Sequence, residues 1–292
     1  MSLAIKYRPS AIKEVQGNKQ TLAALESVLS RPQGEIQHAM LFTGPSGCGK
    51  TTLARIVAER LGCHGRDYCE VDSADFRGID TIREVRRQMS YKPMESACRV
   101  WLLDECHQLS KDGQSALLKA LEDTPPHVYF LLATTDPEKL LPTIRGRCAS
   151  FEVSPLDDDE MLRHLRQVAS AERKRVSPEV LKQIVRDSLG SCRNALQVLD
   201  KVIDLPVEDM KAAAEQVAAK ENAVIDLCRA LMKREKWAVV AGIIKGLEKE
   251  DPEKTRLAII GYCSSVLLNT HKDAPQAFVV MDCFREPLWN NG

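Results

Sequence analysis

Residues 44–51 read GPSGCGKT, which has the form G-x-x-x-x-G-K-T of a phosphate-binding loop. The glycines let the backbone turn its N–H groups toward one point, and such a nest of N–H groups binds anions. A triphosphate is the natural occupant. The pattern predicts that Lys50 reaches the β- and γ-phosphates and that the Thr51 hydroxyl ligates Mg²⁺.

The flanking segments supply the context that this motif requires. The apolar run at residues 39–43 is typical of a buried strand, and residues 52–61 have the spacing of a helix. A strand, a glycine loop and a helix in this order aim a helix N-terminus at the bound phosphates. This context favours phosphate binding over the alternative, a glycine-rich turn without a ligand.

Asp104 and Glu105 follow a second apolar run, at residues 100–103. Two adjacent carboxylates at the end of a strand can divide the work: Asp104 would hold the Mg²⁺ shell, and Glu105 would orient and polarise the attacking water. The alternative is a solvated turn. Thr135 closes a further strand at residues 128–134 and could hydrogen-bond the same water, or it could belong to a turn before Pro137.

Two arginines lie at positions where a phosphate partner would explain them. Arg193 stands in the first turn of an expected helix, where a cation opposes the helix dipole. Arg147 lies in a basic loop before the last strand and would point away from its own nucleotide, so a functional role for it needs a second subunit. By itself Arg147 could equally be an ordinary surface residue.

The expected helix at residues 78–90 carries Arg83, Arg86 and Arg87. A helix N-terminus with clustered arginines can bind a phosphodiester backbone. The alternative, a solvated helix face balanced by Asp80 and Glu84, is slightly preferred on spacing alone. The apolar-rich stretch at residues 89–94 is either core or a protein-docking segment.

The composition is that of a soluble globular protein of two or three domains: 292 residues, 44% hydrophobic and 28% charged. Lys plus Arg and Asp plus Glu both number 41, so any nucleic-acid contact must be a local patch. There is no apolar run of bilayer length and no signal peptide, so we expect a cytoplasmic chain with its ten cysteines reduced and no membrane partner. Cys63, His64 and Cys69 lack a fourth ligand, which makes a zinc site unlikely.

Alternating strands and helices up to residue 153 predict an α/β fold with a mostly parallel sheet, whose ligands gather at the carboxyl ends of the strands. Beyond residue 154 the sequence predicts helices only. The 157–160 run of acidic residues begins one of them, and Ser177-Pro178-Glu179 begins another. Leu205-Pro206 looks like a joint between two helical parts.

Together these residues resemble the clamp-loader branch of the AAA+ ATPases, the family of the gamma/tau subunits of bacterial DNA polymerase III and the small subunits of replication factor C. The similarity covers about residues 3–203. It is carried by the stretches YRP at 7–9, GPSGCGKT at 44–51, DECH at 104–107, SALLKALE at 115–122, PPHV at 125–128, FLLATTDP at 130–137 and GSCRNAL at 190–196.

This resemblance implies a AAA+ nucleotide-binding domain at residues 1–153, a helical lid at 154–205 and a helical collar for oligomerisation at 206–292. It implies an ATP- and Mg²⁺-dependent subunit of a pentameric ring, together with other clamp-loader subunits, that opens a sliding clamp and loads it on primer-template DNA. Residues 89–94 would then face the clamp.

The resemblance also implies roles for single residues. Thr135 would be the first sensor, Arg193 the second, and Arg147 the finger that completes the ATP site of a neighbouring subunit. The DNA backbone would be followed by Arg77, Gly78 and Gln114. The set expected to bind ATP and Mg²⁺ comprises Tyr7, Arg8 and Pro9 beside the adenine, then Gly44, Pro45, Ser46, Gly47, Cys48, Gly49, Lys50, Thr51, Thr52 and Asp104.

Two departures from the family pattern stand out. Gly146 replaces the serine of the family's Ser-Arg-Cys, which alters the turn before Arg147, and the zinc module of gamma subunits is cut to residues 63–69. Two other functions stay open. One is a different AAA+ nucleic-acid motor such as a branch-migration helicase, and the other is a non-hydrolysing structural subunit of the same ring.

Overall fold

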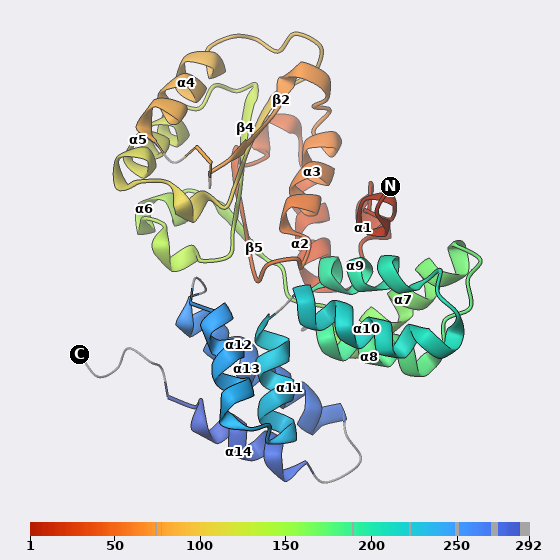
Figure 1. The fold of residues 1–292 in the computed structure, drawn as a ribbon. Coiled ribbons are helices and arrows are strands. Elements are labelled where there is room, and N and C mark those ends of the chain that lie inside the picture. The colour runs from red at the N-terminus through yellow and green to blue at the C-terminus, as the bar shows by residue number, and fades with distance from the viewer. Residues whose placement is uncertain are drawn as a thin grey trace. The chain divides into compact units, whose positions relative to one another are not determined.

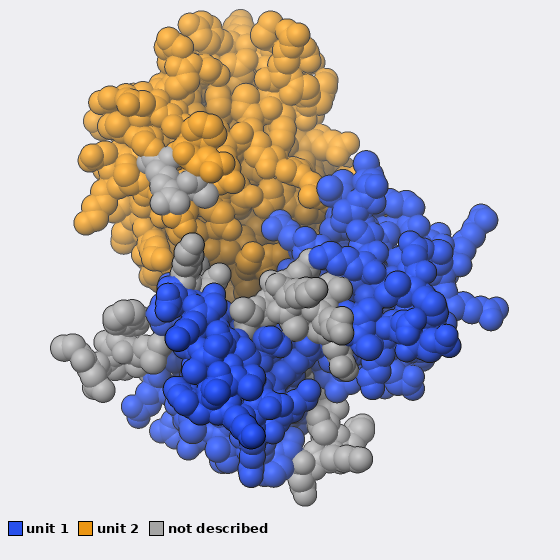
Figure 2. Space-filling model, in the orientation of Figure 1, with its two compact units in different colours: residues 1–7, 157–292 blue, residues 8–156 orange. Residues whose placement is uncertain are grey.

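The computed structural model describes residues 1–73, 75–76, 78–188, 190–221, 223–248, 251–269 and 274–286. The chain forms two compact units, one of residues 8–156 and one that combines residues 1–7 with 157–292 (Figure 2). We refer to them as the sheet unit and the helical unit.

The sheet unit contains a five-stranded parallel sheet in the order β2-β3-β4-β1-β5 (Figure 1). The prediction of an α/β fold with a parallel sheet is therefore confirmed. The apolar runs seen in the sequence become its central strands, and the bounds are β1 Ala39–Thr43, β2 Tyr68–Asp72, β3 Arg99–Asp104, β4 Val128–Thr134 and β5 Ala149–Glu152.

Helices cover both faces of this sheet, which explains why the central strands β3 and β4 are mostly apolar and are buried along nearly their whole length. Successive side chains of β1 alternate between the faces: Met40 and Phe42 pack with Leu53 of α3, whereas Leu41 packs with Ile82 of α4. The helices of this unit are α2 Lys19–Leu29, α3 Lys50–Arg60, α4 Ile79–Met89, α5 Lys111–Glu122 and α6 Pro142–Arg145, with short 3₁₀ helices η1 Ile12–Glu14, η2 Gln33–Glu35, η3 Gly65–Asp67, η4 Cys106–Gln108 and η5 Pro137–Lys139.

The helical unit contains no strand among its described residues. Its first helix, α1, comes from the N-terminus and packs against α9, where the Leu3 N–H donates to Asp200 Oδ1 at 3.3 Å. A capping box at Asp157 and Glu160 begins α7, as the acidic run predicted. The bounds are α1 Leu3–Lys6, α7 Asp158–Ala171, α8 Pro178–Ser188, α9 Cys192–Val202, α10 Val207–Glu221, α11 Ala223–Lys233, α12 Trp237–Gly246, α13 Pro252–Asn269 and α14 Pro275–Cys283.

A separate apolar core forms among α11 to α14, around Cys228, Ile259, Cys263 and Ala277. The expected division of the helical part into a lid and a collar at residue 205 stays a prediction. Among the described residues, every helix is too short or too polar to cross a membrane.

Candidate nucleotide-binding site

The loop between β1 and α3 folds as its glycines require. Gly44 has a φ of 141°, and a Cβ placed there would lie 2.0 Å from the Val153 carbonyl oxygen, so only glycine fits. Gly49 has a φ of 108° and serves as the N-cap of α3. This left-handed backbone turns the chain sharply into the helix, so that the first N–H groups of α3 lie at the mouth of the loop.

Two side chains at the start of α3 line this loop. Lys50 is buried, and its Nζ donates to the Pro45 carbonyl at 2.9 Å, which holds the ammonium group across the loop. Thr51 Oγ1 donates to Asp104 Oδ2 at 2.8 Å. A hydroxyl and a carboxylate oxygen this close are the hard oxygen ligands that suit Mg²⁺ beside a phosphate. The residues present therefore fit a magnesium–triphosphate complex.

The strand order explains how distant residues meet here. Since β4 lies between β3 and β1, the carboxyl ends of these three strands are adjacent. Asp104 is the last residue of β3, and its Oδ1 accepts the Glu105 N–H at 2.9 Å. Thr135 follows β4 and donates its hydroxyl hydrogen to Glu105 Oε2 at 3.1 Å. Lys50, Thr51, Asp104, Glu105 and Thr135 are thus gathered at one edge of the sheet.

His107 is a member of this cluster to which the sequence analysis gave no role. It is buried, and its Nδ1 lies 3.3 Å from Glu105 Oε2 and 3.0 Å from Thr134 Oγ1. The sequence places the histidine just after the two carboxylates, but only the turn at Glu105 brings its ring back onto that side chain. The sequence gives no signal of this contact, because the burial of the ring and the turn at Glu105 are known only from the structure.

Arg147 contacts the opposite end of its own unit. Its guanidinium donates to Glu122 Oε1 at 2.5 Å and to the Thr143 carbonyl at 3.3 Å, and its side chain is partly exposed. Both partners belong to α5 and α6, so this arginine does not join the cluster around Lys50. This position agrees with a role toward another molecule, and the finger role itself stays a prediction.

The residues expected beside the adenine are divided between the units. Tyr7 belongs to the helical unit, where its hydroxyl donates to Glu172 Oε1 at 2.6 Å. The hydrogen bond from Lys6 is the main reason that the pKa of Glu172 is below its usual range, and the hydrogen bond from Tyr7 lowers this pKa further. Arg8 and Pro9 begin the sheet unit. Their contacts with a base therefore stay predictions.

Arg193 is exposed in the first turn of α9, in the helical unit. The N-cap Ser191 accepts the Asn194 N–H through its hydroxyl, so this helix end is formed as the sequence indicated. The cation nevertheless opposes the helix dipole, as expected. Its role as second sensor stays a prediction.

Gln114 corrects one of the sequence expectations. It was expected to contact the DNA backbone, but its side chain is buried and fully engaged within the protein. Its Nε2 donates to the carbonyls of Leu109 and Lys139, and its Oε1 accepts the Leu141 N–H at 2.9 Å. Both donors and the acceptor are used, so the side chain joins α5 to the segment after β4 instead of reaching DNA.

Arg77 and Gly78, two residues expected to contact DNA, come just before α4 in the sequence. Gly78 is the N-cap of α4, and Arg77 lies outside the described residues. The three arginines of α4 are each paired with a carboxylate at 2.8–3.1 Å, which favours the solvated-face interpretation: Arg83 with Asp80, Arg86 with Asp123 and Arg87 with Glu84.

The thiols at the shortened zinc segment belong to the apolar core. Cys63 and Cys98 are both buried there, and a hydrogen bond between them, followed by burial, raises the pKa of the Cys63 thiol. Within the described residues no group of three or more His, Cys, Asp or Glu side chains gathers into a metal site.

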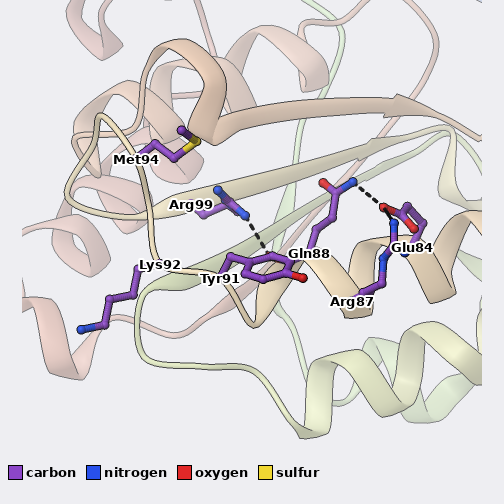
Figure 3. A pocket seen from close by; sticks show the side chains of 7 residues that line it. All are labelled: Glu84, Arg87, Gln88, Tyr91, Lys92, Met94 and Arg99. Carbon is purple, nitrogen blue, oxygen red and sulfur yellow. Dashed lines mark hydrogen bonds and ion pairs between the residues drawn. The ribbon is translucent and has the colours of Figure 1, made fainter.

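A second surface feature lies between α4 and β3. An open hollow of about 630 Å³ is formed there (Figure 3), and it is lined by Glu84, Arg87, Gln88, Tyr91, Lys92, Met94 and Arg99. Tyr91 is 62% exposed and Met94 72% exposed at its rim. These two side chains come from the stretch that was expected to be either core or a docking segment. Their exposure argues against the core for residues 91–94, whereas Met89 is buried in the core.

A buried carboxylate holds this segment in shape. Asp67 is completely buried and accepts the backbone N–H groups of Met94, Glu95 and Ser96 at 2.7–2.9 Å and the Arg99 guanidinium at 3.2 Å. Burial alone would raise the pKa of Asp67, but these donors outweigh it and bring the pKa to about 2. Arg99 also donates to the Gln88 carbonyl, which ties the end of α4 to the same point.

Comparison with known proteins finds relatives of this chain. Residues 67–157 match the family model described as DNA polymerase III, delta subunit. The tau subunit of Escherichia coli DNA polymerase III is 34% identical over 276 residues, which is 85% of this chain and 43% of the relative. The gamma/tau subunit of Mycobacterium tuberculosis is 37% identical over 70% of this chain and 39% of the relative.

The gamma subunit of Buchnera aphidicola is 35% identical over 70% of this chain and 61% of the relative. The chain therefore spans 39% to 61% of the length of these relatives. Among solved structures, the Thermotoga maritima RuvB Holliday junction branch migration motor has a TM-score of 0.66 at 20% identity, over 86% of this chain and 90% of that one. A likeness at this identity concerns the fold alone.

The parallel sheet and the glycine loop before α3 define a P-loop fold, which the RuvB structure shares. The sequence relatives show which family of P-loop proteins this chain is related to. The chain is a gamma/tau-like member of the clamp-loader AAA+ ATPases.

Proposed function

We propose that this protein is the ATP-hydrolysing subunit of a sliding-clamp loader, which uses ATP to open a DNA polymerase clamp and place it on primer-template DNA. The observation that carries the proposal is the assembled cluster of Lys50, Thr51, Asp104 and Glu105 in a chain related to gamma/tau subunits. A subunit with a purely structural role would not need this set.

The cluster assigns a task to each group. Lys50 and the N–H groups of the loop bind the phosphates, and Thr51 with Asp104 holds Mg²⁺, which neutralises charge on the β- and γ-phosphates. Glu105 accepts a proton from the attacking water, and Thr135 orients the Glu105 carboxylate. Electrostatic stabilisation and positioning supply most of the catalysis in phosphoryl transfer, so the placement of these groups matters more than any covalent step.

The remaining site residues complete the pocket in this proposal. Tyr7, Arg8 and Pro9 border the adenine, and Arg193 contacts the γ-phosphate from the lid. Arg147 reaches the ATP of the neighbouring subunit in a ring, where a finger of this kind raises the hydrolysis rate by about 10³ to 10⁵. Its contacts with α5 and α6, outside its own cluster, support this assignment.

The partners follow from the same proposal. Primer-template DNA passes the ring near Arg77 and Gly78, and the clamp contacts residues 89–94. The exposure of Tyr91 and Met94 beside an open hollow supports the second contact, since exposed apolar side chains at the rim of a hollow are typical of protein interfaces. The helices after residue 205 form the collar of the ring.

The proposal is tested by the rate of ATP hydrolysis of the assembly that contains this chain, measured with and without primed DNA and its clamp. We expect low turnover alone and a rise of at least tenfold with both partners. Lys50→Ala serves as the control, because it removes the phosphate contact. ATP turnover that does not change with the clamp but rises with a branched DNA junction would indicate a branch-migration motor. Zero turnover would indicate a structural subunit.

A further inference from the structure

The Glu105 carboxylate is held by one of its two oxygens. Thr135 donates to Oε2 at 3.1 Å, and His107 Nδ1 lies 3.3 Å from that same oxygen. In the part of the chain that the structure describes, no hydrogen bond is recorded for Oε1. The side chain of Glu105 is one-third exposed, whereas that of His107 is almost completely buried.

We propose that His107 is a positioning residue of the hydrolytic reaction: its Nδ1–H fixes Glu105 Oε2, so that Oε1 is presented to the attacking water. This inference rests on the proposed ATPase function. His107 itself touches neither ATP nor water in this arrangement, and it acts only through Glu105.

The backbone explains why the histidine reaches a side chain two residues away. Glu105 has φ 47° and ψ 41°, in the left-handed region that residues other than glycine rarely adopt. This turn begins η4, which carries Cys106 and His107 into the core. The imidazole therefore approaches the Glu105 carboxylate from the buried side, and the exposed side stays open to solvent.

The tautomer follows from the neighbours of the ring. Gln108 Nε2 lies 3.0 Å from His107 Nε2, and since an amide nitrogen only donates, the imidazole must accept there. A neutral imidazole then carries its hydrogen on Nδ1. That N–H points to Thr134 Oγ1 at 3.0 Å, and Glu105 Oε2 lies 3.3 Å from the same nitrogen. A lone pair on Nδ1 would instead repel the carboxylate, so the Glu105 charge favours the same tautomer.

Three substitutions separate positioning from packing. His107→Asn puts an amide nitrogen near the place of Nδ1, His107→Gln puts one near Nε2, and His107→Phe keeps a ring without a donor. In the ATPase assembly we expect the variants His107→Gln and His107→Phe to have a kcat about 10- to 100-fold below that of the wild type. Losses of this size are typical of residues that orient a catalytic group. We expect the variant His107→Asn to keep most of the wild-type kcat.

The dissociation constant for a fluorescent ATP analogue should stay within about twofold in all three variants, because the phosphate contacts of Lys50 and Thr51 are unchanged. His64→Asn, at an exposed histidine of the same unit, is the matched control and should retain wild-type turnover. A wild-type kcat in the Phe variant would overturn the inference, and so would equal losses of kcat in Asn and Phe.

A spectroscopic measurement tests the tautomer independently of turnover. Long-range ¹H–¹⁵N correlation spectra of the full chain should show His107 protonated at Nδ1 and unprotonated at Nε2. A hydrogen on Nε2 alone would overturn the inference. If the wild-type assembly bound ATP but hydrolysed none of it, the proposed function would fail instead, whatever the spectrum of His107 showed.

Discussion

Two adjacent carboxylates, Asp104 and Glu105, have different tasks because their backbones differ. Asp104 ends a regular strand and points at Thr51, whereas Glu105 lies in the left-handed region and turns toward Thr135. A strand continued by one more residue would have sent the second side chain to the opposite face of the sheet. The turn at Glu105 therefore brings both carboxylates to one site.

At this scale the central prediction concerns Glu105→Gln. The amide keeps the size of the side chain but has lost the basic oxygen, so we expect hydrolysis to fall by about 10² to 10⁴ while ATP binding is retained. Steady-state turnover and the dissociation constant for ATP should be measured on the same assembly. Glu138→Gln, at an exposed carboxylate elsewhere in the sheet unit, is the control. Undiminished turnover in Glu105→Gln would refute the role.

The sequence could predict most of this site and not all of it. The motif at residues 44–51, the DE pair after an apolar strand and Thr135 after the next strand name five of the clustered groups, because each follows a recognisable strand. The contact of His107 with Glu105 depends on one left-handed residue and on Thr134 of a distant strand. Neither feature can be predicted from the spacing of nearby residues, so the sequence alone could not reveal the role of His107.

At the scale of elements, Asp67 organises the segment that carries Tyr91 and Met94. Three backbone N–H groups and a guanidinium surround this one carboxylate, which links η3, the loop and β3. The buried ion pair of Asp67 with Arg99 gives this connection a fixed shape.

This arrangement predicts a pH dependence of stability. The pKa of Asp67 is about 2 when folded, against 3.8 for the free side chain, so its ionised form stabilises the fold above pH 4. The ionised Asp67 contributes about 2 kcal/mol to the free energy of unfolding, and this contribution is lost as the pH falls from about 4 toward 2. We expect Asp67→Asn to be less stable at pH 7 by about 2–4 kcal/mol, since it leaves Arg99 buried without its partner.

Urea denaturation at pH 7 and at lower pH tests this directly. The difference in free energy of unfolding between the wild type and Asp67→Asn should narrow as the pH falls. Glu95→Gln is a matched control, because that exposed side chain is adjacent while its backbone N–H still reaches Asp67. A difference that stays constant with pH would contradict the role of the charge.

Gln114 carries a second prediction at this scale. Gln114→Ala leaves the Leu141 N–H and two carbonyls without this partner, and we expect a loss of about 2–4 kcal/mol in the free energy of unfolding. DNA affinity measured at several salt concentrations distinguishes this role from a phosphate contact. The slope of affinity against salt should be unchanged, whereas loss of a phosphate contact would reduce the slope by about one.

The elements themselves were largely predictable. Continuous apolar runs bounded by turns marked β1 and β4 at their observed ends, because parallel strands covered on both faces are mostly apolar. The inward direction of Gln114 was not predictable, since a polar residue on a short helix looks solvated until its distant partners Lys139 and Leu141 are known. The same holds for Tyr7, whose partner Glu172 lies 165 residues away.

At the scale of the whole molecule, the ATP site depends in this account on two subunits. The groups that bind and activate lie at one edge of the sheet, while Arg147 stands apart, beside Glu122 of α5 and Thr143 of α6. An arginine that cannot serve its own cluster can serve a neighbour's. A ring is the assembly in which every subunit both provides and receives such a group.

Mixing two inactive variants tests this central claim most directly. Assemblies made only with Glu105→Gln or only with Arg147→Ala should bind ATP and lack turnover. In a mixture, an Arg147→Ala subunit with intact Glu105 can receive Arg147 from a Glu105→Gln neighbour, so we expect ATP hydrolysis to reappear at a fraction of the wild-type rate. A mixture that assembles and binds ATP but hydrolyses no more than its two components would contradict the account.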